Sequence, residues 1–425
     1  MADAAFAAYG LITFCLLAVC GSTLWWMLHA WRQPELHHET GNDGFSGRNE
    51  PAHSFSLLVP ARHEEYVLGA TLARLGALDH PDFEIVVVVG HDDPATYRVA
   101  AEAMEAAPDV VRLVVDRSWP KSKPKALNTG LEFCTKEIVG IFDAEDEVSL
   151  EILRQVDSAF TRQGADVVQA AVQLVTMHGR WYSLRNCLEY LFWFRSRIHA
   201  HARAGVVPLG GNTVFVRRQL LEDNGGWNGD CLAEDCEIGV RLSSRGARVA
   251  VSYDPRFATR EETPTSFRAF VRQRTRWSQG YLQVFRLGHW RALPTRRQRW
   301  LAAYILLFPM VQGLAGLFVI ASVATIVFVK MPLVLAMFTT LPAFFQLLVI
   351  GAELAGLAEL CRTYYLRHRW YDYVSLVITA IFYQLVLAFA AGRATWREFR
   401  GDRGWEKTAH VGAHRAAVLP GPVEV

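Results

Sequence analysis

The sequence predicts an α/β fold: a doubly wound mixed sheet flanked by transmembrane α-helices. Between residues 54 and 172, short apolar runs alternate with segments of helical periodicity, which is the pattern of strand–helix–strand units. Long runs without any charged residue lie near both ends of the chain, which has 425 residues, 51% of them hydrophobic. At 1.5 Å per residue, those runs are long enough to cross the roughly 30 Å hydrocarbon core of a bilayer.

The expected strands and helices follow one another in order. Residues 83–89 form a continuous Ile/Val run, which is typical of a strand buried on both faces. Leu68, Leu72 and Leu75 recur with helical spacing and predict a helix over 67–78. The other expected strands are 53–59, 110–115, 138–142 and 166–172, and the other expected helices are 96–107, 125–133 and 150–160.

Four uncharged runs predict the membrane segments. They cover residues 4–28, 301–329, 331–352 and 373–392. We expect an N-terminal transmembrane anchor at 1–32, and an interface helix with C-terminal transmembrane segments at 291–392. A cleaved signal peptide is disfavoured because Trp25, Trp26 and Trp31 stand where a small-residue cleavage site would be. We expect these tryptophans to lie at the membrane interface.

Basic residues beside the apolar runs predict the orientation. Lys and Arg favour the cytosolic side, so the polar domain at 53–290 and the basic tail at 393–425 are both expected in the cytosol of a multi-pass protein of the cell (plasma) membrane. Three full C-terminal spans would place the tail outside. Either one segment lies in the interface or re-enters, or the tail breaks the rule. The net charge of +2 indicates no nucleic-acid partner, and seven cysteines without a zinc-site spacing predict free thiols.

Polar residues follow two of the expected strands directly. Asp92 and Asp93 come after the strand at 83–89, and Asp143, Glu145 and Asp146 come after the strand at 138–142. Open α/β sheets bind ligands at the carboxyl ends of their strands. The chain has no Gly-x-Gly-x-x-Gly after its first strand and no Walker sequence, so we expect phosphate to be held through a metal. The carboxylates of Asp143 and Glu145, two residues apart, suit Mg²⁺ or Mn²⁺. A solvated acidic turn at the start of a helix would have the same sequence.

Two further motifs carry candidate chemistry. Glu234-Asp235 offers a general base, or alternatively an acidic first turn of a helix. In Gln273-Arg274-Thr275-Arg276-Trp277, the arginine at 276 suits a diphosphate and the tryptophan suits the face of a sugar. The same segment could lie as a basic amphipathic helix on the membrane surface, and the two roles are compatible.

These motifs, in this order, resemble the processive family 2 glycosyltransferases, the group of cellulose, chitin and hyaluronan synthases, in its bacterial membrane type. The family pattern D…DxD…(T)ED…Q(Q/R)xRW is matched from about residue 54 to 290. Glu145 replaces the second Asp of DxD, Ala233 replaces the Thr before Glu-Asp, and His63 replaces an Asn in the V-P-x-x-N-E segment. Trp405-Glu406-Lys407-Thr408 resembles a C-terminal tryptophan motif near a channel mouth.

The resemblance implies a GT-A-like fold, Mg²⁺ or Mn²⁺ as cofactor, and a role for each matched residue. Catalysis is expected from Asp235, as the base, with Glu234. The expected nucleotide-sugar-binding residues are Glu64, Asp92, Asp93, Lys123, Lys125 and Asp143. The expected metal ligands are Asp143, Glu145 and Asp146. The expected diphosphate- and acceptor-binding residues are Gln273, Arg274, Arg276, Trp277 and Gly211.

The predicted function is a membrane-bound, inverting transfer of a sugar from a nucleotide sugar, UDP in preference to GDP, to a growing polysaccharide with a β-linkage. One alternative is a single transfer to a membrane lipid acceptor, and another is a non-catalytic nucleotide-binding membrane scaffold. A transporter is disfavoured because the apolar runs carry no charged residues. The expected partners are therefore a nucleotide sugar donor, a polysaccharide or lipid-linked acceptor, and membrane lipid.

Overall fold

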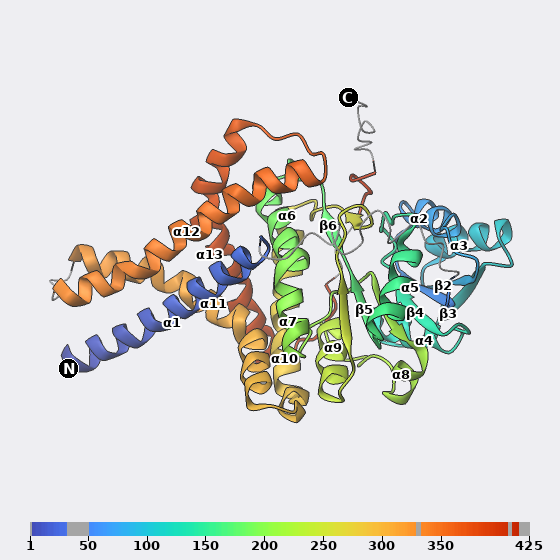
Figure 1. Cartoon of the computed structure of the whole chain (residues 1–425), viewed down its shortest axis with the longest axis horizontal. Helices are drawn as coiled ribbons and strands as arrows, with labels where there is room; N and C mark the ends of the chain where they lie inside the picture. The colour runs from blue at the N-terminus through green and yellow to red at the C-terminus, as the bar shows by residue number, and fades with distance from the viewer. Residues whose placement is uncertain (1, 32–50, 329–332, 407–409, 416–425) are drawn as a thin grey trace.

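The computed structural model describes residues 2–31, 51–328, 333–406 and 410–415. In Figure 1 the sheet domain lies at one end of the molecule and a group of long helices projects from the other, with α6, α7 and α10 between them. None of the seven cysteines forms a disulfide.

The main sheet has seven strands in the order β3-β2-β1-β4-β7-β5-β8. Strand β7 runs antiparallel to both neighbours, and the other pairings are parallel, so the predicted mixed sheet is confirmed. Each strand expected from the apolar runs is present, within a few residues of the expected bounds. The strands are β1 (Phe55–Ala61), β2 (Phe83–Gly90), β3 (Val111–Asp116), β4 (Ile138–Ile141), β5 (Val167–Ala170), β7 (Val214–Arg217) and β8 (Val249–Ser252).

Helices cover both faces of this sheet, which confirms the doubly wound arrangement. The expected apolar faces of the helices supply the two cores, and Leu72 and Val156 pack on one side of the sheet while Leu127 packs on the other. One face carries α2 (Leu68–Gly76), α3 (Pro94–Ala106) and α5 (Ile152–Gln163); the other carries α4 (Lys123–Leu131), α8 (Arg218–Asp223) and α9 (Glu234–Ser244).

A smaller layer joins the sheet domain to the long helices. Strands β6 (Val172–Leu174) and β9 (Thr259–Glu261) pair in parallel. A nearly continuous helical rod follows, in which α6 (Ser183–Phe192) passes through the π-helix η1 (Trp193–Arg197) into α7 (Ile198–Ala204). Buried side chains of α6 pack in one core with residues of α1 (Ala2–His29) and α12 (Leu333–Thr363), so this layer is the base of the long helices.

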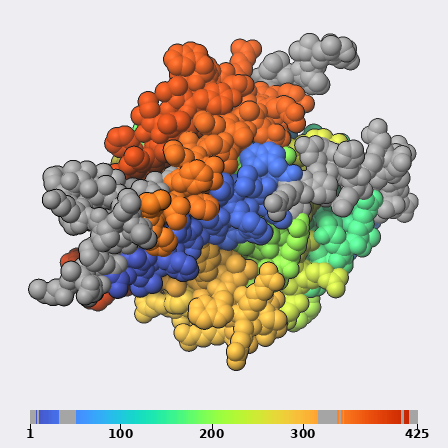
Figure 2. Space-filling model, turned by 60° about the vertical axis from the view of Figure 1, so that its left-hand side comes forward, coloured from blue at the N-terminus to red at the C-terminus, as the bar shows by residue number. Residues whose placement is uncertain are grey.

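Among the described residues, three helices are long and apolar enough to cross a membrane: Gly10–His29, Phe344–Thr363 and Trp370–Phe399. They belong to α1, α12 and α13 (Trp370–Phe399). Helix α11 (Arg296–Phe328) covers most of the run expected at 301–329. Residues 329–332 lie outside the described part, so a fourth span stays a prediction, as do the domain boundaries. Figure 2 shows α1 lying along the neighbouring α11 and α12.

One prediction about the N-terminal helix is wrong for one tryptophan. Trp25 and Trp31 are exposed, as interfacial residues would be. Trp26 is buried instead, because its ring packs against Phe308 of α11 and against Arg197 at the end of the π-helix. The aromatic side chain therefore fixes α1 to the rest of the protein.

Candidate active site

A single cavity of about 850 Å³ runs from the carboxyl edge of the main sheet to the long helices. We refer to it as the central cavity. At one end it is lined by residues that follow β1 and β4, and at the other by residues of α1, α11, α12 and α13. The predicted residues Glu64, Lys123, Asp143, Glu145, Gly211, Glu234, Asp235, Gln273, Arg274, Arg276 and Trp277 all line it.

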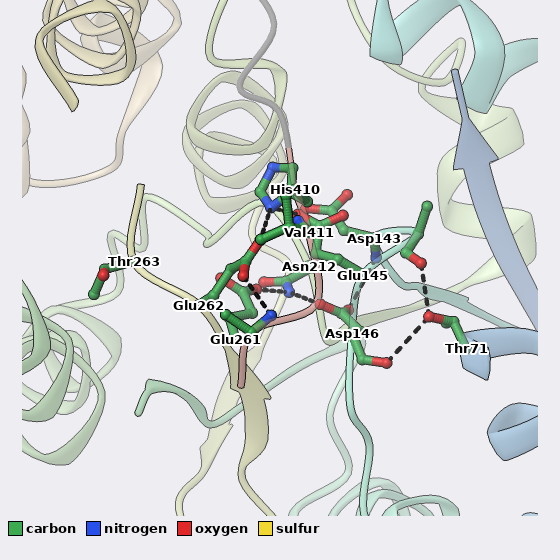
Figure 3. Close-up of polar contacts among 12 residues, drawn as sticks. Thr71, Asp143, Glu145, Asp146, Asn212, Glu261, Glu262, Thr263, His410 and Val411 are labelled. Carbon is green, nitrogen blue, oxygen red and sulfur yellow. Dashed lines mark hydrogen bonds and ion pairs between the residues drawn. The ribbon is translucent and has the colours of Figure 1, made fainter. Parts of the chain in front are cut away.

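Carboxylates gather where β4 and β9 end, as Figure 3 shows. Asp146 accepts a hydrogen bond from the backbone N–H of Asp143 at 2.9 Å and another from the Asn212 amide at 2.9 Å. The same Asn212 amide also donates to Glu261. Burial, and then the neighbouring charges of Glu145 and Asp143, raise the pKa of Glu261 to about 8. The cluster therefore concentrates more negative charge than its few donors neutralise, which favours binding of a cation.

The C-terminal tail crosses this cluster. His410 Nδ1 lies 3.1 Å from Glu145 Oε1. Glu262 accepts hydrogen bonds from the backbone N–H groups of Val411 at 2.6 Å and Ala413 at 2.7 Å. Arg415 donates to the carbonyl oxygens of residues 67 and 145, at 2.8 and 3.0 Å. The tail is therefore bound to the sheet domain on both sides of the carboxylate cluster.

Three of these groups are placed to share a metal ion. One ligand atom from each of Glu64, Glu145 and His410 lies within 4.8 Å of the other two. Although burial lowers the pKa of His410, the surrounding carboxylates, Glu145 foremost, raise it by a larger amount. Two carboxylates and an imidazole are a donor set that Mn²⁺ accepts, whereas Mg²⁺ prefers oxygen ligands alone.

The Glu234-Asp235 pair opens α9 and faces the cavity. Burial, followed by the charge of Asp235, raises the pKa of Glu234 to about 7, and burial also raises the pKa of Asp235. A Cβ atom added at Gly211 would lie 3.2 Å from Asp235 Oδ2, so the missing side chain keeps the space beside this carboxylate open. The pair thus has the raised pKa and the access that a general base needs.

Lys123 lies between the two acidic groups. Its ammonium donates to the Asp143 carboxylate and, at 2.8 Å, to the carbonyl oxygen of Gly211. Burial lowers the pKa of Lys123, but the charges of Asp143 and then Glu234 raise this pKa by more than burial lowers it. The lysine therefore stays charged. A fixed positive charge in this position suits the phosphates of a bound nucleotide.

Helix α10 (Phe267–Leu287) brings the Gln-Arg-x-Arg-Trp motif to the same cavity. The Arg276 guanidinium lies 4.3 Å from the centre of the Trp405 ring in the tail. Arg274 instead pairs with Glu189, which also accepts a hydrogen bond from Tyr383 of α13 at 2.7 Å. Arg276 thus lines the cavity beside the Trp405 ring, whereas Arg274 holds α10 against α6 and α13.

Four predicted residues do not line the cavity. Asp93 caps α3, where it accepts a hydrogen bond from the backbone N–H of Thr96 at 3.2 Å, and Asp92 pairs with Arg62 at 2.8 Å. Lys125 donates to backbone carbonyl groups in the loop before α4. Asp146 is fully buried and holds the loop that carries Asp143. Their direct ligand roles stay predictions, and each has a structural role in the fold.

Sequence reasoning missed several cavity residues. Glu261 and Glu262 lie at and after a three-residue strand that no apolar run announces. His410 lies in a tail without regular periodicity, and only the nearby Trp405 belongs to a recognisable motif. Arg197 and Glu189 belong to the helical rod of α6 and η1, where their charges resemble an ordinary polar face.

Comparison with known proteins matches residues 51–280 to the model of a family described as "Glycosyltransferase like family 2". Beta-monoglucosyldiacylglycerol synthase of Synechocystis sp. is 31% identical over 252 residues, covering 57% of this chain and 51% of that protein. Poly-beta-1,6-N-acetyl-D-glucosamine synthase of Staphylococcus epidermidis is 20% identical over 273 residues, covering 64% of each. The chain spans about half the length of the first of these relatives.

Among solved structures, a mannosyltransferase from Pyrobaculum calidifontis in complex with GDP-Man and Mn²⁺ aligns with a TM-score of 0.54 at 19% identity. The alignment covers 92% of this chain and 99% of that one. At this identity the likeness establishes the fold, and it confirms the predicted GT-A-like architecture.

Proposed function

The chain belongs to the family 2 glycosyltransferases, and from that premise we propose that it transfers a sugar, with inversion, from a nucleoside diphosphate sugar to a hydroxyl group of a membrane lipid. The observation that carries the proposal is the central cavity. It joins the carboxylate cluster and Asp235 at one end to α1, α11 and α12 at the other. Donor and acceptor thus have separate approaches to one reaction centre.

The donor would occupy the sheet end of the cavity. Lys123 and Arg276 both line this end of the cavity and would supply positive charge for the two phosphates. The sugar would then lie between the diphosphate and Asp235, beside the open space at Gly211. UDP stays the expected nucleotide, and the choice of sugar depends on the shape of this space.

Glu64, Glu145 and His410 would hold a divalent cation, with Mn²⁺ favoured by the imidazole ligand. Asp143 lies beside them and lines the cavity, which supports its predicted contact with the metal-bound diphosphate. The bound cation would stabilise negative charge on the leaving diphosphate. His410 comes from the tail, so tail binding and metal binding would favour each other.

The transfer itself follows from the positions of Asp235 and Arg276. Asp235 removes the proton from the acceptor hydroxyl as its oxygen attacks the anomeric carbon. The bond from that carbon to the diphosphate oxygen breaks on the opposite face, and the oxygen keeps the electron pair. Lys123 and Arg276 stabilise the charge that develops there. Attack opposite to the leaving group inverts the configuration, which gives a β-linked product from an α-linked donor.

A lipid acceptor is supported by the lining at the far end. Met27, Ile305, Phe308 and Val349 are apolar and come from the long helices. Relatives named as synthases of a glucosyldiacylglycerol support the same choice. The growing polysaccharide expected from the sequence stays the second candidate. It is supported by Trp277, a half-buried aromatic residue of the cavity wall that could face a sugar ring, and by the relative named as a poly-N-acetylglucosamine synthase.

A product assay separates these proposals. Purified protein with Mn²⁺ is incubated with radiolabelled nucleotide sugars and membrane lipid, and the products are sized. One added sugar on lipid supports the proposed reaction, and a ladder supports the polysaccharide. Release of no nucleoside diphosphate from any donor would refute both. Asp235→Asn should lose about 10²- to 10⁴-fold in turnover while still binding UDP in calorimetry; full activity would remove Asp235 as the base.

The basic flanks support a cytosolic position for the sheet domain, where nucleotide sugars are made available to such an enzyme. Cysteines placed on exposed loops of the sheet domain should therefore react with a membrane-impermeant reagent only after the cells are opened. Labelling of intact cells would place the domain outside and contradict this topology.

A further inference from the structure

The arginines that line the central cavity fall into two groups. Three have carboxylate partners: Arg62 with Asp92, Arg185 with Glu353, and Arg274 with Glu189. Two, Arg197 and Arg276, have no carboxylate partner among the residues that the structure describes. Arg276 adjoins Glu234 and Asp235 and serves the donor in the proposed reaction. Arg197 is a cation of this cavity to which the reaction has given no role.

Arg197 ends the π-helix η1, and aromatic rings surround its head group. The guanidinium carbon lies 4.0 Å from the centre of the Trp26 ring, 4.4 Å from that of Phe308 and 5.3 Å from that of Trp193. Its Nε–H is buried without a hydrogen-bond partner. Rings attract the cation over their faces but leave the in-plane N–H donors free. Because a buried charge without a counter-ion is unfavourable, the site favours an anion that those donors can bind.

The surroundings place such an anion between the chemistry and the membrane helices. Tyr281 lines the same cavity, and its phenol interacts with the charges of both Asp235 and Arg197. On the other side, Met27 of α1 and Ile305 of α11 continue the wall of the same cavity. Helices α1 and α11 lie side by side there, as Figures 1 and 2 show. An anionic group on Arg197 would thus have a reaction centre on one side and apolar surface on the other.

We propose that Arg197 binds the phosphate of a phosphate-bearing lipid acceptor, whose apolar chains lie along α1 and α11. This inference rests on the proposed function, because it specifies the acceptor. The phosphate is a diester whose adjoining alcohol carries the reacting hydroxyl. Its two free oxygens can be bound by a guanidinium through two parallel hydrogen bonds. A phosphate monoester offers the same oxygens but no hydroxyl, so it can bind at Arg197 without accepting a sugar.

Binding of short-chain lipids to the full-length protein in detergent tests the proposal without turnover. The probes are dioctanoyl phosphatidate, dioctanoyl phosphatidylglycerol, neutral dioctanoylglycerol and inorganic phosphate, each measured by calorimetry. At least one phosphate lipid should bind tenfold or more tightly than dioctanoylglycerol. Equal binding of the neutral lipid would overturn the proposal, and binding of inorganic phosphate as tight as that of either phosphate lipid would overturn the lipid part of it.

Two substitutions and a matched control assign the effect to Arg197. Arg197→Gln should abolish the preference for phosphate lipids, and Arg197→Lys, which keeps the charge but not the fork of donors, should retain part of it. Arg203→Gln removes an exposed arginine of the following helix and should keep the full preference. If Arg197→Gln fails to fold, Arg197→Lys alone decides, because an unchanged preference and unchanged affinity in that variant would refute recognition by the guanidinium.

Turnover separates this inference from the proposed reaction. Discrimination between the lipids without any sugar transfer would refute the reaction and leave the Arg197 site standing. Transfer to dioctanoylglycerol as efficient as transfer to dioctanoyl phosphatidylglycerol would support the reaction and refute the site. For the preferred phosphate lipid, the acceptor KM should rise at least tenfold in Arg197→Gln.

Discussion

The tail contact at Glu262 gives a prediction whose magnitude follows from the structure. This buried carboxylate accepts two backbone hydrogen bonds, from Val411 and Ala413. Glu262→Gln keeps one acceptor oxygen and turns an NH₂ group toward the second donor. A hydrogen bond to a charged group contributes about 1.5–3 kcal/mol, so losing one should weaken tail docking by roughly 10- to 100-fold, since about 1.4 kcal/mol corresponds to a factor of ten.

Hydrogen–deuterium exchange of the peptide that contains residues 410–415 measures this change directly. Protection of its amides should fall by the same factor in Glu262→Gln. Glu151→Gln, at an exposed glutamate that begins α5, is the matched control and should leave the exchange unchanged. Because His410 comes with the tail, the apparent affinity for Mn²⁺ should fall in parallel. Unchanged exchange in Glu262→Gln would refute the idea that this carboxylate holds the tail.

Three further outcomes are expected. Burial raises the pKa of Asp235, and the base must be deprotonated, so kcat should rise with pH above the ordinary range of an aspartate and then level off; a flat profile of nucleotide release from pH 4 to 8 would contradict this. Lys123→Ala removes a partly buried, paired charge, which should cost about 2–5 kcal/mol of transition-state stabilisation. The value of kcat/KM for the donor should therefore fall at least roughly 30-fold. A smaller loss in initial-rate assays would count against the binding of phosphate by Lys123. In Gly280→Ala the new Cβ would meet Ala233 at 2.4 Å, so thermal unfolding should show about 1–3 kcal/mol of destabilisation, whereas Gly76→Ala meets nothing within 4 Å and should be neutral or better.

The sheet could largely be predicted because its central strands are buried on both faces. Their apolar runs, such as β2, are continuous and have no competing interpretation. Strand β7 could not be predicted in the same way. It has four residues, and it gains stability by inserting antiparallel between β4 and β5, which are distant in sequence. Short strands owe their existence to such non-local pairing rather than to a local pattern.

The residues of the site also include some that the sequence predicts and some that depend on non-local contacts. Asp143 and Glu145 come together with Asp235 because strand ends and helix starts meet at one edge of a sheet, which the order of the motifs indicates. The contribution of His410 depends on where the chain returns after three long helices. No spacing in the sequence fixes that return. The close approach of Gly280 to Ala233 could not be predicted from the sequence either. It explains why a small residue precedes Glu234, because a larger side chain at position 233 would push α10 away from the cavity.

The return of the tail also bears on the number of membrane crossings. Residues 410–415 contact Glu145, Glu262 and Val67, so the tail lies on the same side as the sheet domain. We therefore expect the chain between them to cross the bilayer an even number of times, although it contains three long helices. We propose that α13 remains on the near side, although it is long and apolar enough to cross. It packs along α10 of the sheet domain, is joined to it through Tyr383 and Arg274, and exposes an apolar stripe that includes Ile378, Ile381 and Phe382. A helix with one face on the protein and one apolar face outward can lie along the membrane surface; in this proposal α11 and α12 would form a crossing pair, and the basic tail would lie in the cytosol as its charges predict.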